Sequence, residues 1–169
     1  MSADRPVRVA LNGFGRIGRT ILRILLRDAP DIDLVLINEI EPLSTCAYLF
    51  EFDSVFGPWP GDVEAGDKAL VVDGKRIPFH AEPDLRALDL TGVDLVLECT
   101  GMGGTRTIAE RGIEAGAGAV LVSGPSAEAD VTLVLGANAK DISDQRIISN
   151  ASSTINSFAP LLPVFCFLS

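Results

Sequence analysis

The sequence is poor in the residues that form disulfide frameworks and metal sites. Its three cysteines, Cys46, Cys99 and Cys166, are far apart and include no Cys-x-x-Cys pair. We therefore expect no disulfide framework, and a reducing compartment fits better. The single histidine, His80, follows Phe79 in a strand-like run, which favours a structural or surface role over that of a ligand or base. No metal site is predicted.

Long apolar runs and an excess of basic charge are also missing. No run reaches the length of a membrane span, and residues 1–6 lack the hydrophobic core of a signal peptide, so we expect a cytoplasmic protein without a membrane partner. The formal net charge of −9 disfavours binding to nucleic acid. With 169 residues, 47% of them hydrophobic, the chain is long enough and apolar enough for one domain with a substantial core.

A glycine-rich turn lies between a predicted strand at residues 7–11 and a predicted helix at residues 16–28. The turn has the spacing Gly-x-Gly-x-x-Gly, which in this context is typical of dinucleotide binding. Gly13 permits the tight turn, Gly15 lets a pyrophosphate approach the backbone, and Gly18 lets the helix pack closely on the strand. The N-terminus of the helix offers N–H groups to the phosphates. An ordinary glycine-rich turn is the alternative.

An acidic residue follows the second predicted strand at the distance expected for a ribose ligand. The apolar run at residues 33–38 predicts a buried parallel strand, and Glu39 comes directly after it, about 20 residues beyond Gly18. A carboxylate there accepts hydrogen bonds from both ribose hydroxyls and repels a 2′-phosphate, which favours NAD over NADP. A solvated glutamate at a strand end is the alternative interpretation.

The rest of the chain alternates strands and helices. We predict helices at residues 42–52 and 105–115, and strands at residues 94–99, 119–123, 131–135 and 146–149. Residues 53–66 resemble a loop, and Asp73-Gly74 predicts a hairpin between residues 69–72 and 76–80. The predicted fold is α/β, a Rossmann-type doubly wound, mostly parallel sheet with a small hairpin insertion.

Five segments together resemble the glyceraldehyde-3-phosphate dehydrogenase family in their order and spacing. They are Asn12-Gly13-Phe14-Gly15-Arg16-Ile17-Gly18-Arg19, Ile37-Asn38-Glu39, Cys99-Thr100-Gly101, Ser123-Gly124-Pro125-Ser126 and Ser149-Asn150-Ala151-Ser152-Ser153-Thr154-Ile155-Asn156. The resemblance runs from about Val7 to about Pro163 and covers only the first half of that family's length. Erythrose-4-phosphate dehydrogenases are close relatives, and Asn38-Glu39 is similar to some of them.

The resemblance implies a glycolytic reaction and a set of site residues. In the family a cysteine thiolate attacks an aldehyde phosphate, hydride passes to NAD, and inorganic phosphate releases the acyl thioester. The implied NAD-binding residues are Asn12, Gly13, Phe14, Gly15, Arg16, Ile17, Gly18, Glu39, Thr100, Gly101 and Ser123. Ser152 and Thr154 match side chains that contact substrate or inorganic phosphate. Residues 1–150 then form the NAD-binding domain and residues 151–169 begin the active-site helix of a catalytic domain; the family assembles as a homotetramer.

The sequence departs from the family where the chemistry takes place. Ser153 stands at the position of the nucleophilic cysteine, and a serine hydroxyl is a far weaker nucleophile than a thiolate at neutral pH. The family's general-base histidine belongs to the second half of its length. We expect NAD binding with little or no catalysis, and a non-catalytic interaction module is the alternative. An isolated domain, a naturally shortened chain and an engineered nucleophile all stay open. Pro163 is expected to interrupt the helix, and residues 164–168 form an apolar tail suited to an oligomer contact.

Overall fold

The computed structural model describes residues 5–161. Pro163, the apolar tail and Cys166 lie outside the described residues. Within that range the chain folds around one large sheet of nine strands. In spatial order the strands are β10 (Val131–Thr132), β11 (Ile147–Ser149), β9 (Ala119–Val122), β8 (Leu95–Glu98), β1 (Val7–Asn12), β2 (Ile32–Asn38), β7 (Lys75–His80), β6 (Ala69–Val72) and β5 (Val63–Gly66).

The sheet is parallel from β10 to β7, and the chain order reverses at β1. This strand lies between β2, which follows it in the chain, and β8, which follows much later. In open α/β sheets a ligand binds outside the carboxyl ends of the strands at such a switch point. The Rossmann-type α/β prediction is therefore confirmed, and the site is expected at the carboxyl ends of β1, β2 and β8.

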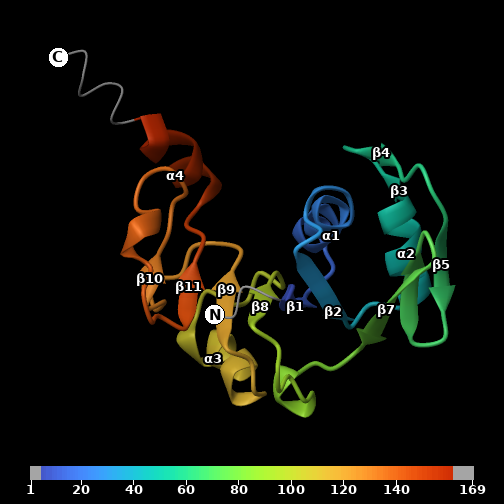
Figure 1. The fold of residues 1–169 in the computed structure, drawn as a ribbon, viewed down its shortest axis with the longest axis horizontal. Helices are drawn as coiled ribbons and strands as arrows, with labels where there is room; N and C mark the ends of the chain where they lie inside the picture. Colours follow the sequence, from blue (N-terminus) through green and yellow to red (C-terminus); the bar gives the residue numbers. More distant parts are fainter. Residues whose placement is uncertain (1–4, 162–169) are drawn as a thin grey trace.

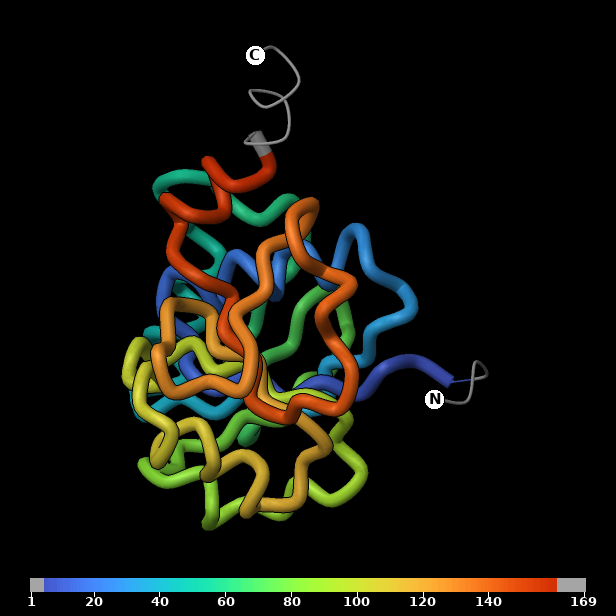
Figure 2. The backbone as a smooth tube through the Cα atoms, turned by 90° about the vertical axis from the view of Figure 1, so that its left-hand side faces the viewer, coloured from blue at the N-terminus to red at the C-terminus, as the bar shows by residue number. Residues whose placement is uncertain are grey.

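Helices cover both faces of the sheet. Figure 1 shows α1 (Arg16–Asp28) above the row of strands and α3 (Arg106–Glu114) below it. The turned view in Figure 2 again places α3 toward the bottom and α4 (Ser153–Phe158) at the top. Alternation along β1 supplies both faces: Val9 and Leu11 pack into the core under α1 and α2 (Leu43–Glu51), whereas Ala10 packs into the core under α3.

The predicted hairpin is longer than the sequence suggested. Asp73 and Gly74 both have positive φ, +50° and +80°, and they close the β6–β7 turn as predicted. β5 adds a third antiparallel strand where a loop was expected, and β7 pairs in parallel with β2. The insertion therefore extends the main sheet.

Other sequence-based boundaries were also wrong. The region expected to be a loop holds, besides β5, a short hairpin of β3 (Phe52–Asp53) and β4 (Gly57–Pro58). Trp59 anchors this region because its ring lies 5.2 Å from that of Phe50 and its indole N–H donates to Asp73 at 3.0 Å. The strand expected at residues 131–135 spans only β10. Single-turn 3₁₀ helices are η1 (Leu85–Ala87), η2 (Ala139–Asp141) and η3 (Ala159–Leu161).

No helix within residues 5–161 is long and apolar enough to cross a membrane. In the same range, no group of three or more histidine, cysteine, aspartate or glutamate residues is arranged to hold a metal ion.

Candidate dinucleotide site

The three glycines of the turn have different structural roles. A Cβ on Gly13, whose φ is +92°, would lie 2.6 Å from the backbone N of Thr100, and a Cβ on Gly18 would lie 2.2 Å from the backbone O of Gly13. A side chain at either position would therefore clash with the backbone and destabilise the fold. A Cβ on Gly15 would meet no atom within 4 Å, and the φ of Gly15 is an ordinary −67°. Gly15 faces open space at the N-terminus of α1, where phosphates bind helices.

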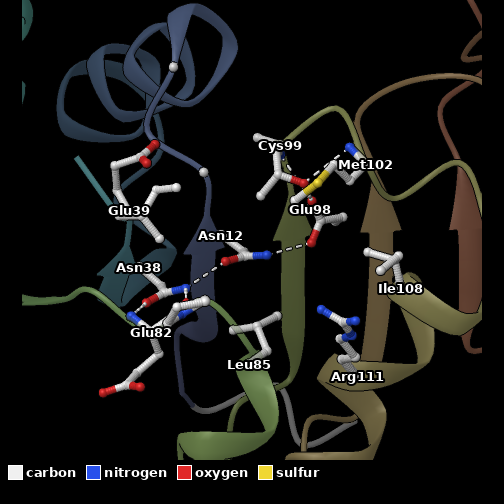
Figure 3. A pocket seen from close by; sticks show the side chains of 15 residues that line it. Asn12, Asn38, Glu39, Glu82, Leu85, Glu98, Cys99, Met102, Ile108 and Arg111 are labelled. Carbon is white, nitrogen blue, oxygen red and sulfur yellow. Dashed lines mark hydrogen bonds between the residues drawn. The ribbon is translucent and has the colours of Figure 1, made fainter.

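A first cavity of about 300 Å³ opens at the carboxyl ends of β1, β2 and β8. It is lined from the glycine turn at one end to α3 at the other, and Figure 3 shows the side chains that surround it. A buried row of polar side chains crosses it. Asn38 Nδ2 donates to Asn12 Oδ1 at 2.8 Å, and Asn12 Nδ2 donates to Glu98 Oε2 at 2.5 Å. The row joins the ends of three neighbouring strands.

Both ends of this row fix its hydrogen-bond direction. At one end the backbone of Glu82 donates to Asn38 Oδ1 at 2.9 Å and accepts from Asn38 Nδ2 at 2.9 Å. At the other end Glu98, which is 2% exposed, also accepts hydrogen bonds from the backbone N–H and the hydroxyl of Thr100. Neither asparagine amide can rotate without placing donor against donor. The cavity therefore has a rigid wall.

Glu39, which its spacing from the glycines predicts to be the ribose ligand, lies beside the glycine turn. Its Oε2 accepts from the Phe14 backbone N–H at 2.7 Å, and its Oε1 accepts from the Glu41 backbone N–H at 3.2 Å. Two backbone donors thus hold the carboxylate at the rim of the first cavity, next to the open space over Gly15. A carboxylate so held can accept further hydrogen bonds from a diol.

A second cavity of about 360 Å³ lies on the α1 side of β8 and β9. Its walls are apolar at Ile17 and Ile21 of α1, and polar at Ser123 and Ser153. Cys99, which follows β8, lines both cavities. Burial raises the pKa of the Cys99 thiol to about 11. This thiol is protonated at neutral pH and is not an activated nucleophile.

The turn before α4 is built tightly and presents Ser153 at the second cavity. The buried Ser149 hydroxyl donates to the Gly124 carbonyl at 3.0 Å and accepts from the Ala151 backbone N–H at 3.2 Å. Ala151 has φ +58°, a left-handed conformation that costs a non-glycine residue about 1–2 kcal/mol. Ser152 caps the helix by accepting from the Ile155 backbone N–H at 3.2 Å. The exposed Ser153 hydroxyl has no described histidine or thiolate beside it that could activate it.

The two cavities bring together most of the residues singled out from the sequence. The first contains Asn12, Gly13, Gly15, Glu39 and Thr100, and the second contains Ile17, Ser123 and Ser153.

Other predicted residues lie outside both cavities. Phe14 turns its ring into the core, 6.1 Å from the ring of Phe50, so only its backbone faces the turn. Arg16 is exposed on the first turn of α1, and Gly101 is exposed with φ +79°. Ser152 serves as a cap and Thr154 is exposed.

Sequence reasoning missed several residues that line the first cavity. Glu98 carried a signal, because it is a charge within an otherwise apolar strand run. Ile108 and Arg111 are three positions apart and so share one face of α3. Nothing in the sequence indicated that this face meets the cavity, because η1 and the ends of three strands complete it from distant parts of the chain.

The donors and the open spaces of this site fit a dinucleotide. Gly15 leaves its backbone uncovered at a helix N-terminus, Glu39 offers a fixed acceptor, and the two cavities, which share Cys99, provide two compartments. Within the described residues, Arg111 also lines the first cavity, and its side chain is 25% exposed.

Comparisons with known proteins agree with this geometry. Residues 7–106, more than half of the chain, match the family model described as glyceraldehyde 3-phosphate dehydrogenase, NAD binding domain. The chain is similar to glyceraldehyde-3-phosphate dehydrogenases of Thermotoga maritima (46% identical over 162 residues), Xanthobacter flavus (43% over 165) and Candida glabrata (45% over 164). These matches cover 93–94% of this chain and 48% of each relative. The chain thus spans about half the length of the curated relatives it matches.

Proposed function

Because the chain belongs to the glyceraldehyde-3-phosphate dehydrogenase family and carries its NAD-binding domain, we propose that it is the cofactor-binding half of a phosphorylating aldehyde oxidoreductase. The observation that carries the proposal is the uncovered Gly15 backbone beside the fixed carboxylate of Glu39. NAD, when bound, supplies a hydride acceptor. The protein contributes binding and orientation, with the phosphates at the glycine turn and a ribose diol at Glu39.

A calorimetric titration of this chain with NAD tests the proposal. We expect saturable binding near one NAD per chain, much weaker binding of NADP, and loss of binding in Gly15→Val. Circular dichroism establishes that both proteins are folded. Absence of NAD binding to a folded wild-type chain would contradict the proposal, as would unchanged affinity in the Gly15→Val variant.

We propose that the intact cytoplasmic protein acts on an aldehyde phosphate, with glyceraldehyde 3-phosphate as the first candidate and erythrose 4-phosphate as the second. Ser152 and Thr154 would contact the substrate or inorganic phosphate. Ser153 lines the second cavity at the nucleophile position, but its hydroxyl has no described activating partner. We therefore expect this chain alone to show no aldehyde oxidation. As in the family, we expect a homo-oligomer, which sedimentation analysis would test.

The serine at position 153 also supports a second function, that of a non-catalytic module that binds a partner chain. The Ser153→Cys variant, supplied with the second half of a family relative, separates the two functions. NADH formation from aldehyde and phosphate in that mixture, absent with Ser153 present, supports the enzyme half. Inactivity of the mixture together with retained association of the two chains supports the module.

A further inference from the structure

Arg111 is an unassigned basic side chain in the first cavity. It projects from α3 toward the cavity, at the end away from Glu39 (Figure 3). Apart from the protonated thiol of Cys99, the other ionisable side chains that line this cavity are the carboxylates Glu39, Glu82 and Glu98, so Arg111 is the only cation among the described lining residues. A lone guanidinium in a cleft needs an electron-rich partner.

The protein supplies only a distant ion-pair partner for Arg111, the carboxylate of Asp84. Arg111 Nε is buried and makes no hydrogen bond within the described residues, and the carboxylate of Asp84 approaches it only to 3.9 Å. That carboxylate is already committed to Arg86, which donates from Nε at 3.0 Å and from Nη2 at 2.6 Å. A buried donor without an acceptor is costly and calls for an explanation. The Arg111 side chain as a whole is 25% exposed, so a ligand in the cavity would contact the accessible part of the guanidinium and not Nε.

The walls beside Arg111 suit a flat ring. Leu85 is 4% exposed and closes one side, and Ile108 lies one helical turn before Arg111 on the same face of α3. Figure 3 shows Leu85 and Arg111 below the Asn12–Glu98 hydrogen bond and Ile108 to the right of Glu98. A guanidinium between apolar side chains can stack on an aromatic ring and donate to ring nitrogens at its edge.

We propose that Arg111 is the residue that recognises the adenine base of the dinucleotide. This inference rests on the proposed function, since it assumes that NAD occupies the first cavity. Glu39 lies at the opposite end of the cavity (Figure 3), hydrogen-bonded to the glycine turn, where it and Gly15 would take the ribose and the phosphates. The base then extends toward Leu85, Ile108 and Arg111. The remaining acceptor that Arg111 could serve is a 2′-phosphate, and the experiment includes NADP for that reason.

The test compares NAD with nicotinamide cytosine dinucleotide, which changes only the base. Both are titrated calorimetrically into wild type, Arg111→Leu, Arg111→Lys and the control Arg27→Leu, whose arginine is 59% exposed at the end of α1. We expect Arg111→Leu to lower the affinity for NAD about tenfold, which is the size of one guanidinium–ring contact. The affinity for the cytosine analogue should change less than twofold. The NAD affinity of Arg111→Lys should lie between those of wild type and Arg111→Leu, because lysine keeps the positive charge but lacks the planar guanidinium group. The NAD affinity of Arg27→Leu should match that of wild type.

Three results would overturn the role of Arg111 without touching the proposed function. They are an unchanged affinity for NAD in Arg111→Leu, an equal weakening of both dinucleotides, and a loss confined to NADP. Equal weakening would indicate a structural effect, and a loss confined to NADP would assign Arg111 to a phosphate. Failure of the wild-type chain to bind NAD would refute the proposed function itself. Thermal unfolding of each apo variant shows whether it is folded.

Discussion

The glycine turn gives the sharpest prediction, because its glycines separate folding from binding. In Gly15→Ala the new methyl group meets no protein atom within 4 Å, and φ −67° suits alanine. Replacing glycine with alanine stabilises the folded protein by about 0.4–1 kcal/mol, because it lowers the conformational entropy of the unfolded chain. Alanine is a poorer N-cap than glycine, by roughly the same amount. The net change in unfolding free energy should lie within about 1 kcal/mol, or about 4 °C in Tm.

The NAD affinity of Gly15→Ala should fall much further than its stability. A methyl group between the backbone and a pyrophosphate is an overpacking of about 1–3 kcal/mol, which corresponds to a loss of about 5- to 150-fold in Kd. Gly15→Val should reach the upper part of that range or beyond. Calorimetric titration measures Kd, and differential scanning calorimetry of the apo protein measures Tm.

Gly18→Ala is the matched control with the opposite signature. Its Cβ would lie 2.2 Å from the Gly13 carbonyl oxygen, so α1 must shift away from β1. An overpacking of about 1–3 kcal/mol lowers Tm by about 2–12 °C for a chain of this size. Wild-type NAD affinity in Gly15→Ala, or a Tm loss in Gly15→Ala equal to that of Gly18→Ala, would refute the division of roles.

Three further variants test other parts of the structure. Glu39→Ser should narrow the preference for NAD over NADP at least tenfold, because it removes the charge that repels a 2′-phosphate; parallel titrations with equal ratios before and after would contradict this. Glu98→Gln should lower the free energy of unfolding in urea by about 1–3 kcal/mol. The glutamine NH₂ group would face a donor of Asn12 or Thr100, both of which donate to the Glu98 carboxylate in the wild type. The Arg5 ion pair and the Arg8 backbone N–H lower the pKa of Asp94 to about 2, below the unfolded value of about 3.9. Its stabilisation is therefore complete above pH ~5 and lost as pH falls toward 2, so Asp94→Asn should be less stable at pH 6 and show a flatter decline from pH 4 to 2.

Local patterns predicted the elements around the glycine turn well. The expected helix at residues 16–28 has the bounds of α1, and Asp73-Gly74 closes a hairpin as predicted. These features depend on short-range spacing and on backbone conformations that few residues adopt. By contrast, the sequence predicts a loop where β5 forms, because the chain there is rich in glycine and proline and the strand forms only through pairing with β6.

The site was predictable only where a motif carried the information. Gly15 and Glu39 follow from the spacing of the fingerprint, whereas Glu98 and Arg111 depend on how β8 and α3 come to lie beside β1. The orientation of the Phe14 ring could not be predicted from the sequence either. A motif residue can contribute its backbone to a ligand while its ring packs in the core, here against Phe50.

The row of hydrogen bonds from Glu82 through Asn38 and Asn12 to Glu98 also bears on the energetics of the whole domain. Its members come from positions up to 86 residues apart, so the first cavity exists only after β2, β1 and β8 have all paired. An unfolded or half-folded chain has no such cavity to offer. A ligand held there therefore stabilises the complete fold by mass action, by about 2.7 kcal/mol at a concentration one hundred times its Kd. The concentration of the cofactor would in this way affect the fraction of the protein that is unfolded and open to proteolysis, as well as the fraction that has cofactor bound.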